Sequence, residues 1–233
     1  MNRAKDKLHR GGTVLVFNPN FWSPALIEHA GGLGFDVAFI DCEHGSAGFE
    51  TAEDLARAAR AAGMTSVLRP WSNEPGLITR FLDCGVGGIQ FPHIEDAREA
   101  REAVEIVRAA RGAAFEDTLV TVMIESAAAA DKLQEIVAVE GIDAVVIGLS
   151  DLACSLGHPG GNQHPDVRQV VERIIESINR AHGAVAGYNL HHWEQERALI
   201  DKGVRWITIH AKTMLARGTR DLFALLGNAK AAR

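Results

Sequence analysis

Short apolar runs recur along the chain, and each is followed by a stretch in which apolar residues are spaced as on one face of a helix. The runs predict eight strands, at residues 13–17, 36–40, 65–68, 87–91, 119–124, 144–147, 183–187 and 206–209. The clearest helical face comprises Val167, Val170, Val171, Ile174, Ile175 and Ile178. Strands that alternate with helices in this way form parallel sheets covered by those helices.

The intervening segments complete a barrel pattern. They predict helices at about 2–12, 24–33, 49–62, 97–107, 127–137, 167–178, 193–202 and 212–226, and a further helix that begins near residue 74. Eight strand–helix units predict an α/β fold, a (β/α)₈ TIM barrel, in a single domain of residues 1–233 with a short N-terminal helix. An open doubly wound sheet is the alternative, although no glycine-rich nucleotide-binding motif follows the first strand.

Composition narrows the class of protein. Apolar residues make up 47% of the chain, enough for a sizeable core, and the net charge of −6 comes without a basic block. Nothing in this distribution of charge suggests a nucleic-acid surface, and a small-molecule partner is favoured. Three cysteines without CxxC spacing fit a reducing compartment, and no leader or membrane span is evident, so we expect a cytoplasmic protein with no membrane partner.

Polar residues gather where the predicted strands end. In a (β/α)₈ barrel these ends open onto one face, which carries the chemistry. The residues at these positions are Asp41, Glu43, His44, Arg69, His93, Glu125, Asp151, His210 and Lys212.

Two carboxylates in this set suit a cation. Glu125 and Asp151 follow neighbouring strands, and two oxygen ligands favour Mg²⁺ or Mn²⁺ over Zn²⁺. The alternative is structural, with each carboxylate in a salt bridge or capping a helix.

A histidine and an arginine supply further candidate chemistry. His44 lies beside Asp41 and Glu43 and is a candidate general base, because imidazole titrates near neutrality and a carboxylate can orient it. Arg69 is suited to a carboxylate or an enolate oxygen, or to a buried ion pair with Asp41 or Glu43. Lys212 is the lysine nearest a strand end and offers a rival Schiff-base route.

The other polar residues are assigned structural roles. We interpret His93, His191, His192 and His210 as structural or loop histidines and the cysteines as packing residues, with Cys42 the one that lies inside a site motif.

These motifs together resemble a known family. Asp41-Cys42-Glu43-His44, Arg69-Pro70 with Asn73-Glu74-Pro75, Glu125, and Gly148-Leu149-Ser150-Asp151-Leu152 are similar to motifs of the HpcH/HpaI aldolases, class II pyruvate aldolases of the phosphoenolpyruvate/pyruvate barrel superfamily. The resemblance runs from about residue 12 to residue 225.

The resemblance implies a lyase that cleaves a 4-hydroxy-2-oxo acid reversibly into pyruvate and an aldehyde. It implies a divalent ion, Mg²⁺ or Mn²⁺ with Co²⁺ as a further candidate, held by Glu125 and Asp151. His44 is then the base and Arg69 stabilises the enolate. Asp83 corresponds to an aspartate that raises the basicity of the histidine from a neighbouring subunit, which implies a homo-oligomer, a hexamer or a trimer-based assembly.

The chain departs from the family pattern at substrate-facing positions. The family commonly has Gln where this chain has Met123, Pro-Ala where it has Leu149-Ser150, and Met where it has His93. By resemblance, Arg69, Met123, Ser150 and Asp151 contact the substrate, and Asp41 and Glu43 support the site.

Two other functions remain open at this stage. One is a citrate-lyase-like acyl-CoA lyase on the same barrel, although no basic cluster for CoA phosphates lies near the strand ends. The other is a non-catalytic keto-acid-binding barrel, for which Met123 and Leu149 are the supporting residues.

Overall fold

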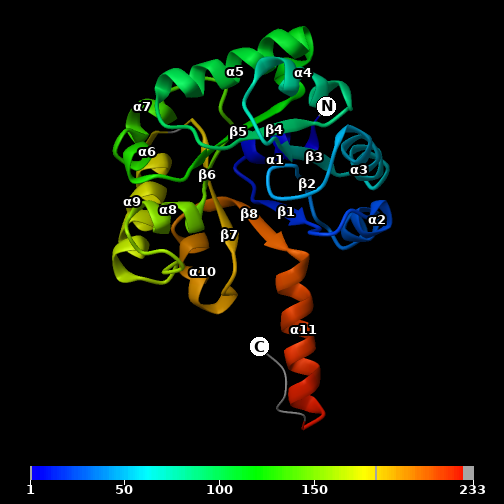
Figure 1. The fold of residues 1–233 in the computed structure, drawn as a ribbon, viewed down its shortest axis with the longest axis vertical. Helices are drawn as coiled ribbons and strands as arrows, with labels where there is room; N and C mark the ends of the chain where they lie inside the picture. Colours follow the sequence, from blue (N-terminus) through cyan, green and yellow to red (C-terminus); the bar gives the residue numbers. More distant parts are fainter. Residues whose placement is uncertain (1, 182, 228–233) are drawn as a thin grey trace.

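The computed structural model describes residues 2–181 and 183–227, and its strands form a closed parallel barrel in chain order (Figure 1). The strands are β1 (Val14–Asn18), β2 (Val37–Asp41), β3 (Thr65–Arg69), β4 (Gly88–Phe91), β5 (Leu119–Ile124), β6 (Ala144–Ile147), β7 (Val185–Leu190) and β8 (Val204–His210). The predicted (β/α)₈ fold is confirmed, and the open sheet is excluded because β1 pairs with β8.

Helices surround the barrel (Figure 1). They are α1 (Arg3–His9), α2 (Pro24–Gly32), α3 (Phe49–Ala61), α4 (Pro75–Asp83), α5 (Ala97–Arg111), η1 (Gly112–Asp117), α6 (Ala127–Asp131), α7 (Leu133–Val137), α8 (Leu149–Ser155), α9 (Pro165–Ala181), α10 (Trp193–Asp201) and α11 (Ala211–Leu225). Among the described residues, no helix combines the length and the apolar character that a membrane crossing requires.

The barrel interior is packed with side chains rather than open. One apolar cluster comes from α1 and the inward faces of the strands and includes Val16, Phe39, Met123, Val146 and Trp206. A second and larger cluster lies between the strands and the outer helices. Because the interior is filled, substrate chemistry is confined to the ends of the barrel.

The short N-terminal helix closes the amino end of the barrel. Lys5 on α1 is buried, and its Nζ donates to the carbonyl of Thr118 at 2.8 Å and lies 3.2 Å from Oδ2 of Asp143. The carboxyl ends of the strands therefore form the accessible mouth.

Several bounds differ from the sequence prediction, and the largest changes are in β7 and in the helix after β5. Strand β7 runs over Val185–Leu190 rather than 183–187, because Tyr188 and Asn189 pair with Ile207 and Thr208 of β8. The helix predicted at 127–137 is divided at Lys132 into α6 and α7.

Helix α11 extends away from the barrel (Figure 1). Its leucines are exposed, with Leu215 at 61%, Leu222 at 52% and Leu225 at 83%. An apolar helix face left in water is unusual for a monomer and is typical of a surface that another chain covers.

Candidate active site

The end of β2 is shaped by one carboxylate. Oδ1 of Asp41 accepts hydrogen bonds from the backbone N–H groups of Glu43 and His44, each at 3.2 Å. This turn directs the side chains of Glu43 and His44 from β2 into the mouth of the barrel. The sequence motif thus folds as one local unit.

Arg69, at the end of β3, lies between the two acidic residues of that turn. Its Nε and Nη2 donate to Oδ1 and Oδ2 of Asp41 at 3.0 and 2.7 Å. Its Nη1 lies 2.8 Å from Oε2 of Glu43, an ion pair without the alignment of a hydrogen bond. Both ion pairs considered from the sequence are therefore present.

The ion pairs between Arg69 and the two acidic residues shift the pKa values of Asp41 and Arg69. Burial works against ionisation of Asp41, but the hydrogen bond and charge of Arg69 outweigh it and hold the pKa of Asp41 below its ordinary value. Burial likewise opposes the charge on Arg69, whereas Asp41 and Glu43 raise its pKa. Both groups stay charged near neutral pH, so the mouth contains a fixed guanidinium.

Glu125 follows β5 and is buried, with only 3% of its side chain exposed. Oε2 accepts the backbone N–H of His93 at 2.8 Å, and among the described residues no hydrogen bond reaches Oε1. A Cβ at Gly148 would lie 2.4 Å from Cγ and 2.5 Å from Oε1 of Glu125, so only glycine leaves room for this carboxylate. Burial raises the pKa of Glu125, against the opposing effect of His93.

His93 lies between two site carboxylates, whereas the sequence suggested only a structural or loop histidine. This residue follows β4 with a positive φ of 54°, and its ring lies between two carboxylates. Nε2 is 2.8 Å from Oε1 of Glu43, and Nδ1 is 3.2 Å from Oε2 of Glu125. The prediction of a structural or loop histidine missed this arrangement, although its place after a strand end was a usable signal.

His44 is open to solvent at the mouth. Its side chain is 65% exposed, and Nε2 lies 3.8 Å from Oε2 of Glu43. That distance leaves the imidazole near a carboxylate and available to a substrate.

Three further predicted site residues lie nearby, and their roles stay predictions. Asp151 and Ser150 are exposed in the first turn of α8, directly after β6, which pairs with β5. Met123 is buried in the barrel interior, with its sulfur 3.8 Å from Nη1 of Arg69 and 3.1 Å from Nε2 of Gln90. Met123 therefore packs beneath the guanidinium.

Asp83 is not brought to the mouth of its own barrel. It is exposed at the last residue of α4, which runs from the carboxyl end of β3 to the amino end of β4. Asp83 therefore lies at the end of the barrel opposite its own mouth.

Two other groups considered from the sequence lack the environment that reactivity requires. Lys212 is exposed, with Nζ 5.9 Å from the ring centre of Phe21, and is not desolvated as a Schiff-base lysine would be. Burial raises the pKa of the Cys42 thiol to about 12, which leaves little thiolate at neutral pH.

His210 is the last residue of β8 and lies beside the end of β1, where it pairs with Asn18. Asn20 donates from Nδ2 to Nδ1 of His210 at 3.1 Å. Burial, followed by the proximity of His191, lowers the pKa of His210 to about 4, and Asp41 and Arg69 also act on it. His210 therefore lies close enough to Asp41 and Arg69 for their charges to affect its pKa.

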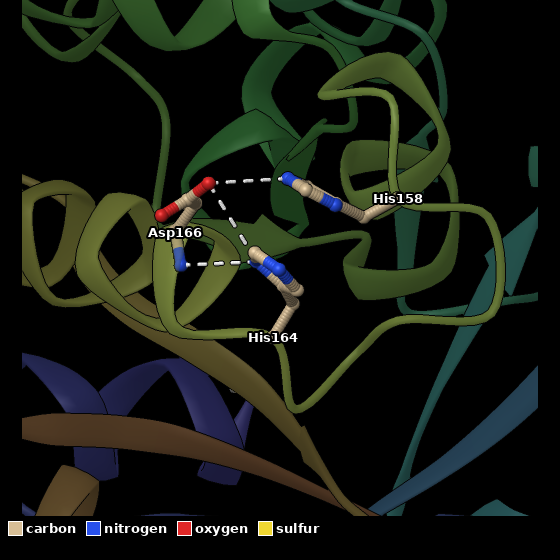
Figure 2. A group of neighbouring side chains, drawn as sticks. All are labelled: His158, His164 and Asp166. Atoms are coloured by element: carbon tan, nitrogen blue, oxygen red, sulfur yellow. Dashed lines mark hydrogen bonds and ion pairs between the residues drawn. The ribbon is translucent and has the colours of Figure 1, made fainter.

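A separate histidine group lies outside the mouth, in the segment between α8 and α9 (Figure 2). Oδ2 of Asp166 is 3.3 Å from Nε2 of His158 and 3.6 Å from Nδ1 of His164, and the rings stack with centres 3.6 Å apart and planes at 18°. An ion cannot lie in both of two nearly parallel ring planes. Nδ1 of His164 also accepts the N–H of Asp166 at 3.3 Å, so the group caps the start of α9.

The mouth has the features of a divalent cation site. Glu125 is a buried residue whose Oε1 accepts no hydrogen bond among the described residues, and Gly148 keeps the space around this carboxylate open. Asp151 follows the adjacent strand and is exposed in the first turn of α8, with a carboxylate of the same chemical type. Carboxylate oxygens suit Mg²⁺ and Mn²⁺, so these residues fit such an ion.

The fold and the mouth define the class of protein, a (β/α)₈-barrel enzyme with carboxylate, imidazole and guanidinium groups at the carboxyl ends of its strands. The family model for "HpcH/HpaI aldolase/citrate lyase" matches residues 14–217. The chain therefore belongs to the HpcH/HpaI aldolase/citrate lyase family, whose members are lyases that act on carbon–carbon bonds.

Individual relatives cover nearly the whole chain. A 5-keto-4-deoxy-D-glucarate aldolase from Salmonella arizonae is 29% identical, over 86% of this chain and 87% of the relative. A family protein from Burkholderia cenocepacia J2315 has a TM-score of 0.87 at 28% identity, covering 97% of this chain and 99% of its own. The citrate synthase SbnG has a TM-score of 0.86 at 28% identity, covering 96% of each chain.

Proposed function

We propose that this enzyme is a class II pyruvate aldolase that cleaves a 4-hydroxy-2-oxo acid reversibly into pyruvate and an aldehyde. The observation that carries the proposal is the convergence of Glu43, His44, Arg69 and Glu125 at one mouth. A base, a fixed cation and a buried carboxylate for a divalent ion are the groups that enolate chemistry needs.

Glu125 and Asp151 are the residues that would hold the ion, Mg²⁺ or Mn²⁺ with Co²⁺ as a further candidate. When bound, the ion supplies Lewis-acid polarisation of the 2-keto oxygen. Met123 and Ser150 stand where the substrate contacts are expected, and Met123 also supports Arg69 from within the barrel.

His44 begins the cleavage by taking the proton from the C4 hydroxyl of the substrate. The C3–C4 bond then breaks, C4 becomes the aldehyde carbonyl, and the electron pair passes to the enolate of pyruvate. Arg69 faces this developing negative charge with a guanidinium that Asp41 and Glu43 already orient. The proton held by His44 is available to return to C3 and complete pyruvate.

The substrate class follows from the chemistry and from the relatives. The Salmonella relative is named for a keto-deoxy sugar acid. We propose a substrate of that type, a 2-oxo acid with a hydroxyl at C4, for this chain as well.

The enzyme is proposed to act as a homo-oligomer, a hexamer or a trimer-based assembly. Asp83 lies at the far end of its own barrel, and α11 leaves its barrel with exposed leucines (Figure 1). A neighbouring copy would cover α11 and bring an Asp83 to the histidine of the next subunit.

The cytoplasm is the proposed location. The three described cysteines, Cys42, Cys84 and Cys154, are all free. Free thiols without a disulfide framework fit a reducing compartment.

The direct test supplies candidate hydroxy-oxo acids and measures pyruvate release. Activity should disappear in excess chelator, return with Mg²⁺ or Mn²⁺, and be lost in Glu125→Gln. Borohydride added with pyruvate should leave Lys212 unmodified. A covalent adduct at Lys212, or activity that persists in chelator, would overturn the class II assignment. Turnover of acyl-CoA esters alone would favour a citrate-lyase-like function.

A further inference from the structure

The ends of β7, β8 and β1 carry a group of polar side chains separate from the carboxylates of the proposed ion site. These strands are neighbours, because β8 pairs with both β7 and β1. His191 follows β7, His210 ends β8, and Asn20 lies just after β1. The rings of the two histidines have their centres 5.8 Å apart and their planes at 26°. Because parallel strands end on one face of the barrel, this group borders the same mouth as Arg69.

Hydrogen bonds to Asn20 determine which ring nitrogen of His210 carries the proton. Oδ1 of Asn20 accepts the backbone N–H of Lys212 at 3.1 Å, so Nδ2 is the atom that faces His210. An amide nitrogen only donates, and Nδ1 of His210 therefore accepts at 3.1 Å. The ring is neutral near pH 7, because burial lowers the pKa of His210 to about 4. Its one ring proton is then on Nε2, where it is available to a ligand.

Buried polar side chains hold both flanks of this group in place. Asn20 has a φ of 57°, in the left-handed region, and its N–H donates to Oδ1 of the buried Asn18 at 3.0 Å. On the other flank, Oε2 of the buried Glu196 accepts the backbone N–H groups of His191 and His192 at 2.7 and 2.8 Å. The group is therefore a fixed arrangement rather than a set of loose surface side chains.

Lys212 adds a positive charge to this edge of the mouth. It is exposed in the first turn of α11, which continues directly from β8 (Figure 1). Its Nζ lies 5.9 Å from the ring centre of Phe21 in the β1–α2 loop. Within residues 2–181 and 183–227, no carboxylate lies within ion-pair distance of this ammonium.

The acidic side chains near this edge are already engaged. Asp41 pairs with Arg69 at 2.7 Å. Glu194, at the start of α10, pairs with Arg217 at 2.5 Å, and Glu196 accepts the two backbone N–H groups described above. The edge therefore offers an N–H donor and an ammonium to a ligand. Such donors favour a negatively charged acceptor, and a single ammonium matches the single charge of a carboxylate.

We propose that His210 and Lys212, flanked by His191, form a subsite for a carboxylate on the aldehyde half of the substrate. The inference rests on the proposed function, because it takes the pyruvate half to bind beside Arg69. The substrate is then a diacid, and cleavage of its C3–C4 bond releases pyruvate and an aldehyde that carries a carboxylate. The competing explanation is that Lys212 is a solvated surface lysine and that the histidines only pack the strand ends together.

The first experiment compares two aldehydes in the synthetic direction, with pyruvate and Mg²⁺ or Mn²⁺ present. Succinic semialdehyde and butanal are a matched pair, because a terminal carboxylate in the first replaces a methyl group in the second. The measured quantity is the ratio of kcat/KM for the acidic aldehyde to kcat/KM for the neutral one. Turnover of butanal reports on the rest of the site, so this ratio separates loss of the subsite from a general loss of activity.

Lys212→Met should lower the ratio by about 10- to 100-fold, the loss expected for one charge-assisted hydrogen bond. His210→Phe should also lower it, whereas Lys212→Arg should retain it because arginine keeps the charge. Lys202→Met is the matched control, since Lys202 follows α10 toward the amino end of the barrel and pairs with Glu172 at 2.6 Å. Thermal unfolding establishes that each variant is folded. A ratio that is unchanged in Lys212→Met, or lowered equally in Lys202→Met, would overturn the subsite.

A binding measurement separates the subsite from the aldolase. In full-length protein labelled with ¹⁵N-histidine, the imidazole resonances of His191 and His210 are followed as succinate or neutral 1,4-butanediol is added. Succinate should shift them saturably in wild-type protein but not in Lys212→Met, and butanediol should leave them in place. Such shifts without turnover of any aldehyde would keep the subsite and reject the aldolase. Absence of a shift that depends on Lys212 would reject the subsite whatever the turnover.

Discussion

The guanidinium of Arg69 holds the carboxylate of Asp41 by two parallel contacts, from Nε to Oδ1 at 3.0 Å and from Nη2 to Oδ2 at 2.7 Å. The two residues are opposite each other in the β2–β3 register, so the pair forms where the strands end. Two contacts fix the plane of the guanidinium. Its remaining nitrogen, Nη1, is then directed toward Glu43 and the mouth.

Arg69→Lys should lower kcat on the order of 100-fold. Removing one preorganised hydrogen-bond donor from the site of developing charge has an effect of that size on kcat. Lysine keeps the charge but cannot form the two-point contact, so Asp41 no longer orients it. Steady-state kinetics of pyruvate release measure the effect. Arg57→Lys on α3, where the exposed arginine pairs with Glu53 and Asp54, is the matched control and should leave kcat unchanged. Similar kinetics for both variants would contradict the role of Arg69.

Gly148→Ala should weaken divalent-ion binding without unfolding the barrel. The new methyl group would lie 2.4 Å from Cγ of Glu125, which must move, whereas the φ of −84° at Gly148 suits alanine. Calorimetric titration with Mn²⁺ measures the change. Gly32→Ala is the control, because a Cβ there meets no atom within 4 Å and alanine favours the helix. Equal Mn²⁺ affinities in the two variants would show that Glu125 is not the ligand.

Mixed oligomers should recover activity lost in single variants. If each site combines His44 of one subunit with Asp83 of its neighbour, His44→Ala and Asp83→Ala are each inactive alone. The two variants are mixed in equal amounts, unfolded and reassembled. About a quarter of the sites should then contain both an intact His44 and an intact Asp83, because subunits pair at random across a repeated interface. Mass photometry checks assembly, and activity no higher than the mean of the two parents after reassembly would place Asp83 outside the neighbouring site.

Lowering the pH should reduce the free energy of unfolding of the wild-type protein because of His210. Its pKa is about 4 in the folded state against an ordinary value of 6.5, so the unfolded chain binds the proton first as pH falls. The free energy of unfolding should therefore decline between about pH 6.5 and pH 4, more in wild-type protein than in His210→Asn. Urea titrations at several pH values measure the difference. Parallel curves, or a nuclear magnetic resonance titration of His210 near 6.5, would contradict it.

The order of strands and helices and the residues that reach the mouth follow from local sequence. Apolar runs such as residues 119–124 form buried strands in a parallel sheet. Residues that follow neighbouring parallel strands lie at the same edge of the sheet. This is why Glu125 and Arg69 were recognisable as candidates before any pairing was known.

Contacts within the mouth depend on the assembled barrel. The β2–β3 register sets Asp41 against Arg69, and the left-handed backbone at His93 turns its ring toward Glu43 and Glu125. The extension of β7 to Leu190 likewise depends on pairing with β8. The sequence by itself determined which groups arrive at one end of the barrel, because strand and helix periodicity are local. Only the tertiary structure decided which groups touch, because register and backbone conformation are fixed by packing between segments far apart in the chain.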